Sequence, residues 1–477
     1  MLKNDRPAGG STAALPLTRS DAENIVVVGP LAEREVHGDY SPTTTLEHGT
    51  ALQGIEEAAA AINPAANVTY IPGMNNAGFD NLRKPSIGAT VNGTRAAVRF
   101  LDADGAELGR VAPAQIIASG DYEGWRGLQP WSTSTDSLST LGAWGGYFGI
   151  TTSVPEGTVT VEVDQSGQAM LGGRFDVRVG STLGSKVATV DALGVAAVGA
   201  YSGPVGAQQL YFVYENDAFE PEFTEDEVAA IRNADAVVAY VGTIAGNNST
   251  YPAITGNPSD SSEDEDRASI DLPRGQDALV EAVAGLNART VVYIQAVSQV
   301  DIDSFSDDVP TILWSTYNGQ YQGDTVGRIL FGRANPSGKL PFTFYTDIAQ
   351  LPNTKDYTMT PTDGRAGRTY QYFTGDVLYP FGHGLSYSTF RYANLRLDSS
   401  EVDVNGTLRA TVDVTNISDR DGKEVVQLYV SSPNAADPYR PDSQLKGFSK
   451  VSIPAHATKT VSIAVDASDL WFWDAQA

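Results

Sequence analysis

Two separate parts of the chain alternate between strand-like apolar runs and helical repeats of apolar residues. In the first part, the run at residues 25–28 ends at a Gly-Pro pair, as a strand buried on both faces does. Apolar residues then recur at helical spacing at Leu52, Ile55 and Ile62. In the second part, strand-like runs lie at 236–241, 291–294 and 312–314, and a helical apolar face comprises Leu279, Val280, Val283 and Leu286. This alternation predicts an α/β domain with a largely parallel sheet covered on both sides by helices.

The hydrophobic pattern changes in the stretch that lies between these two parts, and it changes again at the end of the chain. From about residue 81 to 215, helical periodicity is replaced by short strand-like runs at 97–100, 159–163 and 175–179, separated by Gly, Ser and Thr. Such a stretch predicts a β-sandwich inserted into the α/β domain. Clean alternation returns at 410–415 and 460–465, which predicts a second, smaller sandwich.

The expected fold class is therefore an α/β domain interrupted by an all-β insert and followed by another all-β domain. The expected boundaries are 1–80 for the first part of the α/β domain, 81–215 for the insert, 216–388 for the second part and 389–477 for the last sandwich. The aromatic run at 471–473 is followed by no closing strand, so we expect the last domain to be truncated.

The charge of the chain narrows the classes of partner. The 32 Lys and Arg residues face 58 Asp and Glu residues, which gives a net charge of −26. This field repels phosphate polyanions and anionic lipids, so neither nucleic acid nor a membrane is an expected partner. A neutral polysaccharide is indifferent to the charge, and the 21 Tyr and 6 Trp supply flat faces on which sugar rings stack. The alternative, that acidity only keeps the protein in solution, stays open.

Neither a cofactor nor a metal site is indicated. The sequence has no Cys, which excludes disulfides, thiolate nucleophiles and Cys-based metal sites. The four histidines, His37, His48, His383 and His456, lack the short spacings of paired metal ligands. No apolar run reaches the ~18 residues needed to cross a bilayer, and the first residues have no apolar signal-peptide core. Nothing in the sequence indicates a targeting route.

An acidic cluster at residues 263–266 is the main candidate for chemistry. It lies in a polar stretch between the strand that ends near Gly242 and a helix that opens near Pro273. Loops beyond strand ends are where open α/β sheets bind ligands. Composition alone favours a solvated charge run at this place, because acidic loops are common in acidic proteins.

A family resemblance favours a functional role for the acidic cluster over a solvated charge run. Residues 263–276 resemble the E-x-x-D-R-x-x-(I/L)-x-L-P-x-x-Q signature of family 3 glycoside hydrolases. Three further signatures follow in the family's order: a G-x-x-N-P-S-G-(R/K)-L-P turn at 332–341, the P-G-R-T-Y segment of the β-xylosidase-like branch at 367–372, and the P-F-G-x-G-L-S-Y link into a fibronectin type III-like domain at 380–387. Upstream, residues 2–5, 15–17 and 28–30 resemble the opening of the same C-terminal domain.

The resemblance implies a retaining mechanism with two carboxyl groups. Glu263 matches the Glu that acts as general acid/base in this branch, and Glu265 is the second choice. A carboxyl that a sugar desolvates, with acidic neighbours, keeps a raised pKa and can donate a proton to the leaving oxygen. Asp266 and Arg267 are expected to form a structural pair. Asp264 and Glu265 depart from the family pattern, because these positions are usually less acidic.

The nucleophile that the resemblance implies is an Asp of an N-terminal (β/α)8 barrel, and no segment of these residues matches it. We therefore expect this chain to be the C-terminal portion of a longer glycosidase, inactive alone, with the barrel in cis or on a separate chain. The 367–372 segment favours a β-xylosidase or α-L-arabinofuranosidase that acts on plant-type oligo- or polysaccharides, extracellular by resemblance. The rival interpretation is a non-catalytic carbohydrate-binding or scaffolding protein.

The insert carries a weaker resemblance of its own. The runs 172–181, 187–190 and 209–214 are similar to family 6 carbohydrate-binding modules. Where that family commonly has a T-G-G-W segment with a stacking Trp, this chain has residues 192–195 without one. The other candidate sugar platforms are Trp125, Trp131, Trp144 and Tyr147, for which a place in the sandwich core is an equally open interpretation.

Overall fold

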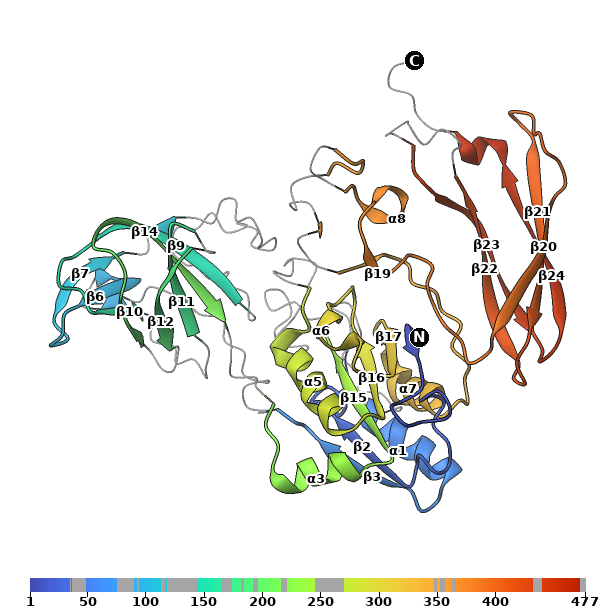
Figure 1. Cartoon of the computed structure of the whole chain (residues 1–477), viewed down its shortest axis with the longest axis horizontal. Helices are drawn as coiled ribbons and strands as arrows, with labels where there is room; N and C mark the ends of the chain where they lie inside the picture. Colours follow the sequence, from blue (N-terminus) through green and yellow to red (C-terminus); the bar gives the residue numbers. More distant parts are fainter. Residues whose placement is uncertain are drawn as a thin grey trace.

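The computed structural model places an α/β domain between two all-β units (Figure 1). The structure describes residues 1–34, 36, 49–74, 90–91, 94–112, 116–117, 145–164, 174–181, 184–191, 196–215, 221–244, 270–346, 350–351, 357–362, 366–431 and 440–471. Within these residues no helix is both long and apolar enough to cross a membrane.

The α/β domain is built on a six-stranded sheet to which both parts of the sequence contribute. In spatial order its strands are β1 (Lys3–Asn4), β17 (Thr311–Ser315), β16 (Thr290–Gln295), β15 (Ala236–Gly242), β2 (Asn24–Val28) and β3 (Asn67–Ile71). All neighbours are parallel except β1, which pairs antiparallel with β17. Every residue of β15 and β16 is buried, as the unbroken apolar runs predict. The predicted parallel sheet is confirmed.

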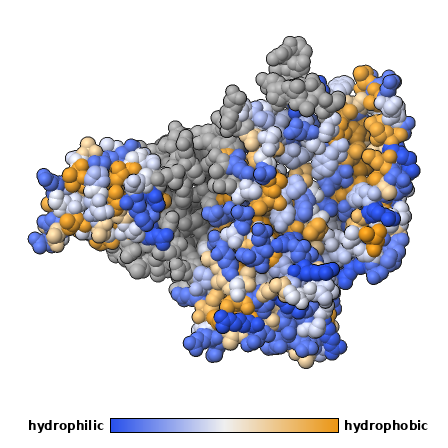
Figure 2. All heavy atoms as spheres, viewed as in Figure 1, coloured by the Kyte–Doolittle hydropathy of each residue, from blue (hydrophilic) through white to orange (hydrophobic). Residues whose placement is uncertain are grey.

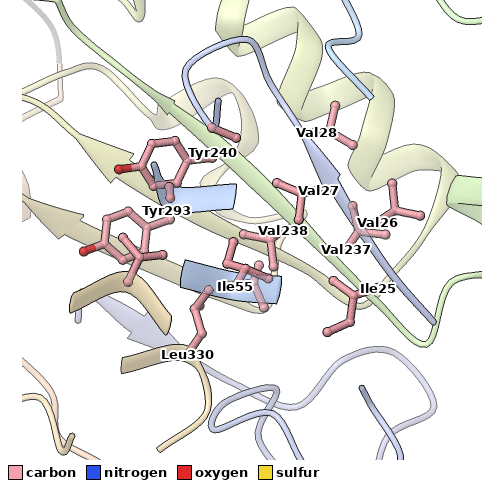
Figure 3. Close-up of a cluster of buried hydrophobic side chains, with 14 of the residues drawn as sticks. Ile25, Val26, Val27, Val28, Ile55, Val237, Val238, Tyr240, Tyr293 and Leu330 are labelled. Atoms are coloured by element: carbon pink, nitrogen blue, oxygen red, sulfur yellow. The ribbon is translucent and has the colours of Figure 1, made fainter. Parts of the chain in front are cut away.

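Helices cover the sheet in two groups. α1 (Ala51–Ile62) packs on α7 (Gln322–Leu330), whereas α5 (Gln276–Leu286) packs on α3 (Glu225–Asn233) and α6 (Asp303–Ser306). The predicted apolar faces are the buried ones, with Ile55 of α1 and Leu279 of α5 fully enclosed. Figure 3 shows Ile55 and Leu330 beside Val27 and Val238 of the sheet.

α1 and α7 approach most closely at glycine residues. A Cβ atom at Gly54 would lie 1.9 Å from the carbonyl oxygen of Gly323, and one at Gly327 would lie 2.2 Å from the carbonyl oxygen of Gly54. Glycine at these positions therefore lets the two helix backbones touch.

The insert is a single nine-stranded antiparallel sheet. Its spatial order is β7 (Glu107–Val111), β6 (Val98–Leu101), β10 (Thr160–Asp164), β13 (Ala196–Ala200), β12 (Lys186–Asp191), β11 (Arg174–Val179), β14 (Gly206–Glu215), β9 (Gly145–Val154) and β8 (Ile116–Ile117), and a separate hairpin pairs β4 (Thr90–Val91) with β5 (Thr94–Arg95). β7 and β9 are in contact although six strands separate them in the sheet order. The sheet thus folds over its own core, in which the rings of Phe148 and Phe212 stack 4.5 Å apart.

The C-terminal β-sandwich has two antiparallel sheets. One contains β20 (Phe390–Leu397), β21 (Thr407–Asn416) and β24 (Thr458–Asp466), and the other pairs β22 (Gly422–Val430) with β23 (Gln444–Ile453). Val414, Val426 and Ile453 are buried between them. Figure 2 shows apolar residues gathered over this sandwich, and its exposed large apolar residues include Leu395, Leu397, Phe448 and Trp471.

Candidate active site at the carboxyl edge of the sheet

The acidic cluster belongs to the segment that joins β15 to α5. The chain leaves the carboxyl end of β15 at residue 244 and the described residues resume at 270, just before the 3₁₀ turn Pro273–Gly275 that opens α5. Glu263, Glu265, Asp266 and Arg267 lie between these points, outside the described residues. Both ends of their segment lie at the edge where open parallel sheets bind ligands.

One side chain holds the two ends of this segment together. Gln276 is fully buried, and its amide nitrogen donates to the carbonyl oxygens of Gly242 and Pro273, each at 2.7 Å. Its amide oxygen accepts from the Gly242 N–H at 3.0 Å. The last residue of the family signature thus connects the end of β15 to the start of α5.

The departure point of the segment is equally constrained. Gly242 has a φ of 153°, and a Cβ atom there would lie 1.9 Å from the carbonyl oxygen of Gln295. The next residue, Thr243, donates its N–H to that same carbonyl at 2.9 Å, and its hydroxyl lies 3.3 Å from the hydroxyl of Tyr317. On the returning side, the carbonyl of Ile270 accepts from the N–H of Asp301 at 2.5 Å.

A buried polar network lies directly beneath this edge. The hydroxyl of Tyr240 donates to the side-chain oxygen of Gln295, whose amide nitrogen donates to Gln322 at 3.4 Å. Gln322 in turn donates to the carbonyl of Arg34 at 2.8 Å. The rings of Tyr240 and Tyr293 stack 5.2 Å apart, and burial raises the pKa of both hydroxyls. These phenols are therefore neutral hydrogen-bonding groups that brace the ends of the strands.

A second carboxyl group lies beside the returning end of the segment. Burial raises the pKa of Asp277, in the first turn of α5, while a hydrogen bond from the Ala278 N–H opposes the shift and the charge of Asp271 adds to it. Sequence reasoning missed Asp277. The available signal was an acidic residue immediately after the signature Gln276, close to Asp271.

The other signatures join the α/β domain to the C-terminal sandwich. In the 367–372 segment, Thr369 has a φ of 57° and donates its N–H to the Tyr345 hydroxyl at 3.0 Å. The hydroxyl of Tyr370 accepts from the N–H of Leu445 in β23 at 3.1 Å. In the 332–341 turn, the side chain of Asn335 accepts from the Tyr387 N–H at 2.9 Å and donates to the Asp421 carbonyl at 3.0 Å. These contacts are structural ones.

Of the insert residues expected to bind sugar, the structure describes only the backbone of Tyr147. Trp125, Trp131 and Trp144 lie outside the described residues. Tyr147 belongs to β9, where its backbone pairs with Val213, and its side chain is not described. Within the described part of the chain, no three His, Asp or Glu side chains are grouped as metal ligands would be.

Comparison with known proteins places two families on this chain. Residues 1–387 match the glycosyl hydrolase family 3 C-terminal domain, and residues 424–477 match the fibronectin type III-like domain. The resemblances to the C-terminal domain of family 3 and to a fibronectin type III-like domain are confirmed, and neither of these two matches is to a carbohydrate-binding module.

The chain is also similar to individual glycosidases. It is 34% identical over 255 residues to a beta-xylosidase of Formosa agariphila, an alignment that covers 53% of this chain and 33% of the relative. It is 32% identical over 268 residues to a periplasmic beta-glucosidase of Salmonella typhimurium, covering 54% and 33%. The fold is similar to that of DesR, a beta-glucosidase from Streptomyces venezuelae solved with D-glucose, with a TM-score of 0.55, 23% identity and coverage of 100% of this chain and 54% of DesR. The aligned part of the chain thus covers about a third of the length of the Formosa agariphila and Salmonella typhimurium relatives.

Proposed function

Because this chain belongs to glycosyl hydrolase family 3, we propose that it supplies the general acid/base of a retaining exo-β-glycosidase. Glu263 is the acid/base, with Glu265 as the alternative. The nucleophile is an Asp on a (β/α)8 barrel that is not among these residues, in cis or on another chain. Retaining glycosidases hold their two carboxyl groups on either side of the scissile bond, so a division between two domains is compatible with the chemistry.

One observation carries this proposal: the signature that contains Glu263 ends in a buried side chain tied to the carboxyl edge of the sheet. Gln276 bonds Gly242 and Pro273, which bound the segment from either side. A solvated charge run has no need of such an anchor. A carboxyl group that a bound sugar partly desolvates has the raised pKa that a general acid requires.

For the substrate, we propose a β-xyloside or an α-L-arabinofuranoside of plant-type polysaccharide. The support is the 367–372 segment of the β-xylosidase-like branch and the similarity to the Formosa agariphila beta-xylosidase. β-Glucosides belong in the same test panel because the other relative and DesR are named as beta-glucosidases. Steady-state rates on matched aryl glycosides of the three sugars rank these candidates.

The test of the acid/base uses this chain together with its barrel. Glu263→Ala is expected to slow hydrolysis of substrates with poor leaving groups by roughly 10²–10⁴, the usual share of general acid catalysis. Activated aryl glycosides need little protonation, so their first step is much less affected. Azide is expected to restore turnover of the variant by replacing the base-activated water.

Glu265→Ala is the matched control, since it removes a carboxyl group two positions along the same loop. A modest, leaving-group-independent effect is expected. If Glu265→Ala shows the leaving-group dependence and azide rescue while Glu263→Ala does not, the acid/base is Glu265.

For the insert, we propose weak binding to xylan or arabinan through its aromatic residues, Trp125, Trp131, Trp144 and Tyr147. The support is the resemblance of its strand sequences to carbohydrate-binding modules. Affinity electrophoresis tests it, and unretarded migration on both polymers would make the insert a spacer.

We also propose that the protein acts outside the cytoplasm, as the name of the periplasmic Salmonella typhimurium relative suggests. Cell fractionation with an antibody to the chain tests this.

A further inference from the structure

Three hydrogen bonds converge on a single buried side chain at the base of the acidic segment. The Gln276 amide satisfies both the N–H and the C=O of Gly242 and also the C=O of Pro273. All four groups are removed from water, so each unmade bond costs the desolvation of a polar group. This amide therefore joins the two ends of the segment directly.

We infer that Gln276 is a positioning residue for the acid/base, acting through the two ends of the segment that carries it. The inference rests on the proposed function. Gly242 and Pro273 have no other common partner among the described hydrogen bonds. A Gln is long enough to bond both while its own backbone belongs to α5.

The two backbone positions that Gln276 joins are each packed against the sheet, so a substitution at Gln276 acts on the link between them. Gly242 touches the backbone of Gln295, so it cannot move toward β16. Leu272, one residue before Pro273, is buried in the core on the α5 side of the sheet. Loss of the amide removes the hydrogen-bonded link between Gly242 and Pro273 and leaves these other contacts in place. A misplacement of a catalytic group by about 1 Å costs on the order of 10²-fold in rate.

The same helix supplies a matched control at its other end. Asn287 caps α5 and is buried. Its amide nitrogen donates to the carbonyls of Ile231 and Ala234 at 2.8 and 2.9 Å, and its oxygen accepts from the Arg289 N–H at 2.8 Å. Gln276 and Asn287 thus make the same kinds of hydrogen bond at opposite edges of the sheet. Of these two side chains, only Gln276 bonds Gly242 and Pro273 at the ends of the acidic segment.

The experiment compares Gln276→Ala and Asn287→Ala in the enzyme that contains this chain and its barrel. Both variants are expected to lower the thermal midpoint. Only Gln276→Ala is expected to steepen the dependence of kcat/KM on leaving-group pKa, with a loss of about 10²-fold for poor leaving groups and a much smaller loss for activated ones. By hydrogen exchange, the Gly242 amide is expected to lose protection in Gln276→Ala and to keep it in Asn287→Ala.

If Gln276→Ala does not fold, Gln276→Glu takes its place, because a carboxyl group buried against two carbonyls is neutral and keeps an acceptor for the Gly242 N–H but only one of the two donors. It is expected to show the same steepening to a smaller degree. An unchanged leaving-group dependence in the folded variant overturns the positioning role. Failure of the proposed function itself has a different signature, in which Glu263→Ala and Glu265→Ala also leave that dependence unchanged.

Discussion

The ammonium group of Lys339 lies 3.4 Å from the carboxylate of Glu424, so one ion pair joins the α/β domain to the C-terminal sandwich. The two side chains are only 18% and 10% exposed. The hydroxyl of Tyr392 donates to the same carboxylate oxygen at 2.8 Å, and Lys339 also donates to the Gly384 carbonyl at 2.7 Å. Each domain thus buries a charge that needs a partner from the other.

Lys339→Met is expected to destabilise the protein by about 3 kcal/mol, because it leaves the Glu424 carboxylate buried without a cation. Thermal unfolding measures the effect. The double variant Lys339→Met/Glu424→Gln removes the uncompensated charge and is expected to be more stable than Lys339→Met alone. Equal stability of the single and double variants would show that the pair is screened by solvent.

Gly54→Ala is expected to destabilise the α1–α7 packing by about 3 kcal/mol, since the added Cβ atom meets the Gly323 backbone at 1.9 Å. This runs against helix propensity, which favours Ala over Gly by up to about 1 kcal/mol. Gly285→Ala in α5 is the control, because no atom beyond its chain neighbours and its own helix backbone lies within 4 Å of the added Cβ. It is expected to be neutral or stabilising. Urea unfolding compares the two, and a neutral Gly54→Ala would mean that the helices separate easily.

The stability of the protein is expected to fall as the pH decreases below about 6.5, the ordinary pKa of histidine. Burial lowers the pKa of His383, although its hydrogen bond to the Leu2 carbonyl opposes the shift and the nearby charge of Lys339 adds to it. The His383 imidazole of the unfolded chain therefore binds a proton more readily than that of the folded chain. The free energy of unfolding consequently decreases as the pH falls below this value.

His383→Gln tests this dependence because glutamine keeps a donor for Leu2 and cannot titrate. The thermal midpoint of the variant is expected to change less between pH 7 and pH 5 than that of the wild type. Parallel curves for the two proteins would contradict a role for His383.

The chain alone is expected to release no nitrophenol from aryl β-xyloside, β-glucoside or α-L-arabinofuranoside. Without an Asp nucleophile opposite Glu263, no glycosyl-enzyme intermediate forms. Spectrophotometric assays of the purified chain against a buffer blank check this. Turnover above the blank would place both carboxyl groups within these residues.

Four of the six strands of the α/β core were predictable because each is an apolar run along the sequence, whereas the edge strands β1 and β3 are only partly buried and were not predicted. An unbroken apolar run such as residues 236–241 has no polar face, so it can lie only in the interior of a sheet. The helical faces followed from spacing in the same way, as the burial of Ile55 and Leu279 shows. The α1–α7 contact was not predictable in detail, although Gly54 inside a helical pattern marks a place where something approaches closely.

The residues of the candidate site were likewise only partly predictable from the sequence. Glu263 was found through a family signature, and its placement falls outside the described residues. The roles of Gln276 and Asn335 depend on partners such as Gly242 and Tyr387 that tertiary packing brings together, so spacing and composition do not reveal them. Composition also did not distinguish the acidic cluster from a solvated loop, because a run of charged residues has the same composition in an active site and on a solvent-exposed surface.

The sheet order has a consequence for synthesis on the ribosome. Residues 25–28 pair with residues 236–239, which emerge only after the entire insert. Until then the apolar strand β2 has β3 on one side and an open edge on the other, and such edges attract other chains. The insert can fold before β15 is synthesised, because the residues of its core all lie between 97 and 212. Nascent chains stopped before β15 should therefore carry a protease-resistant insert attached to an unfinished sheet that depends on chaperones.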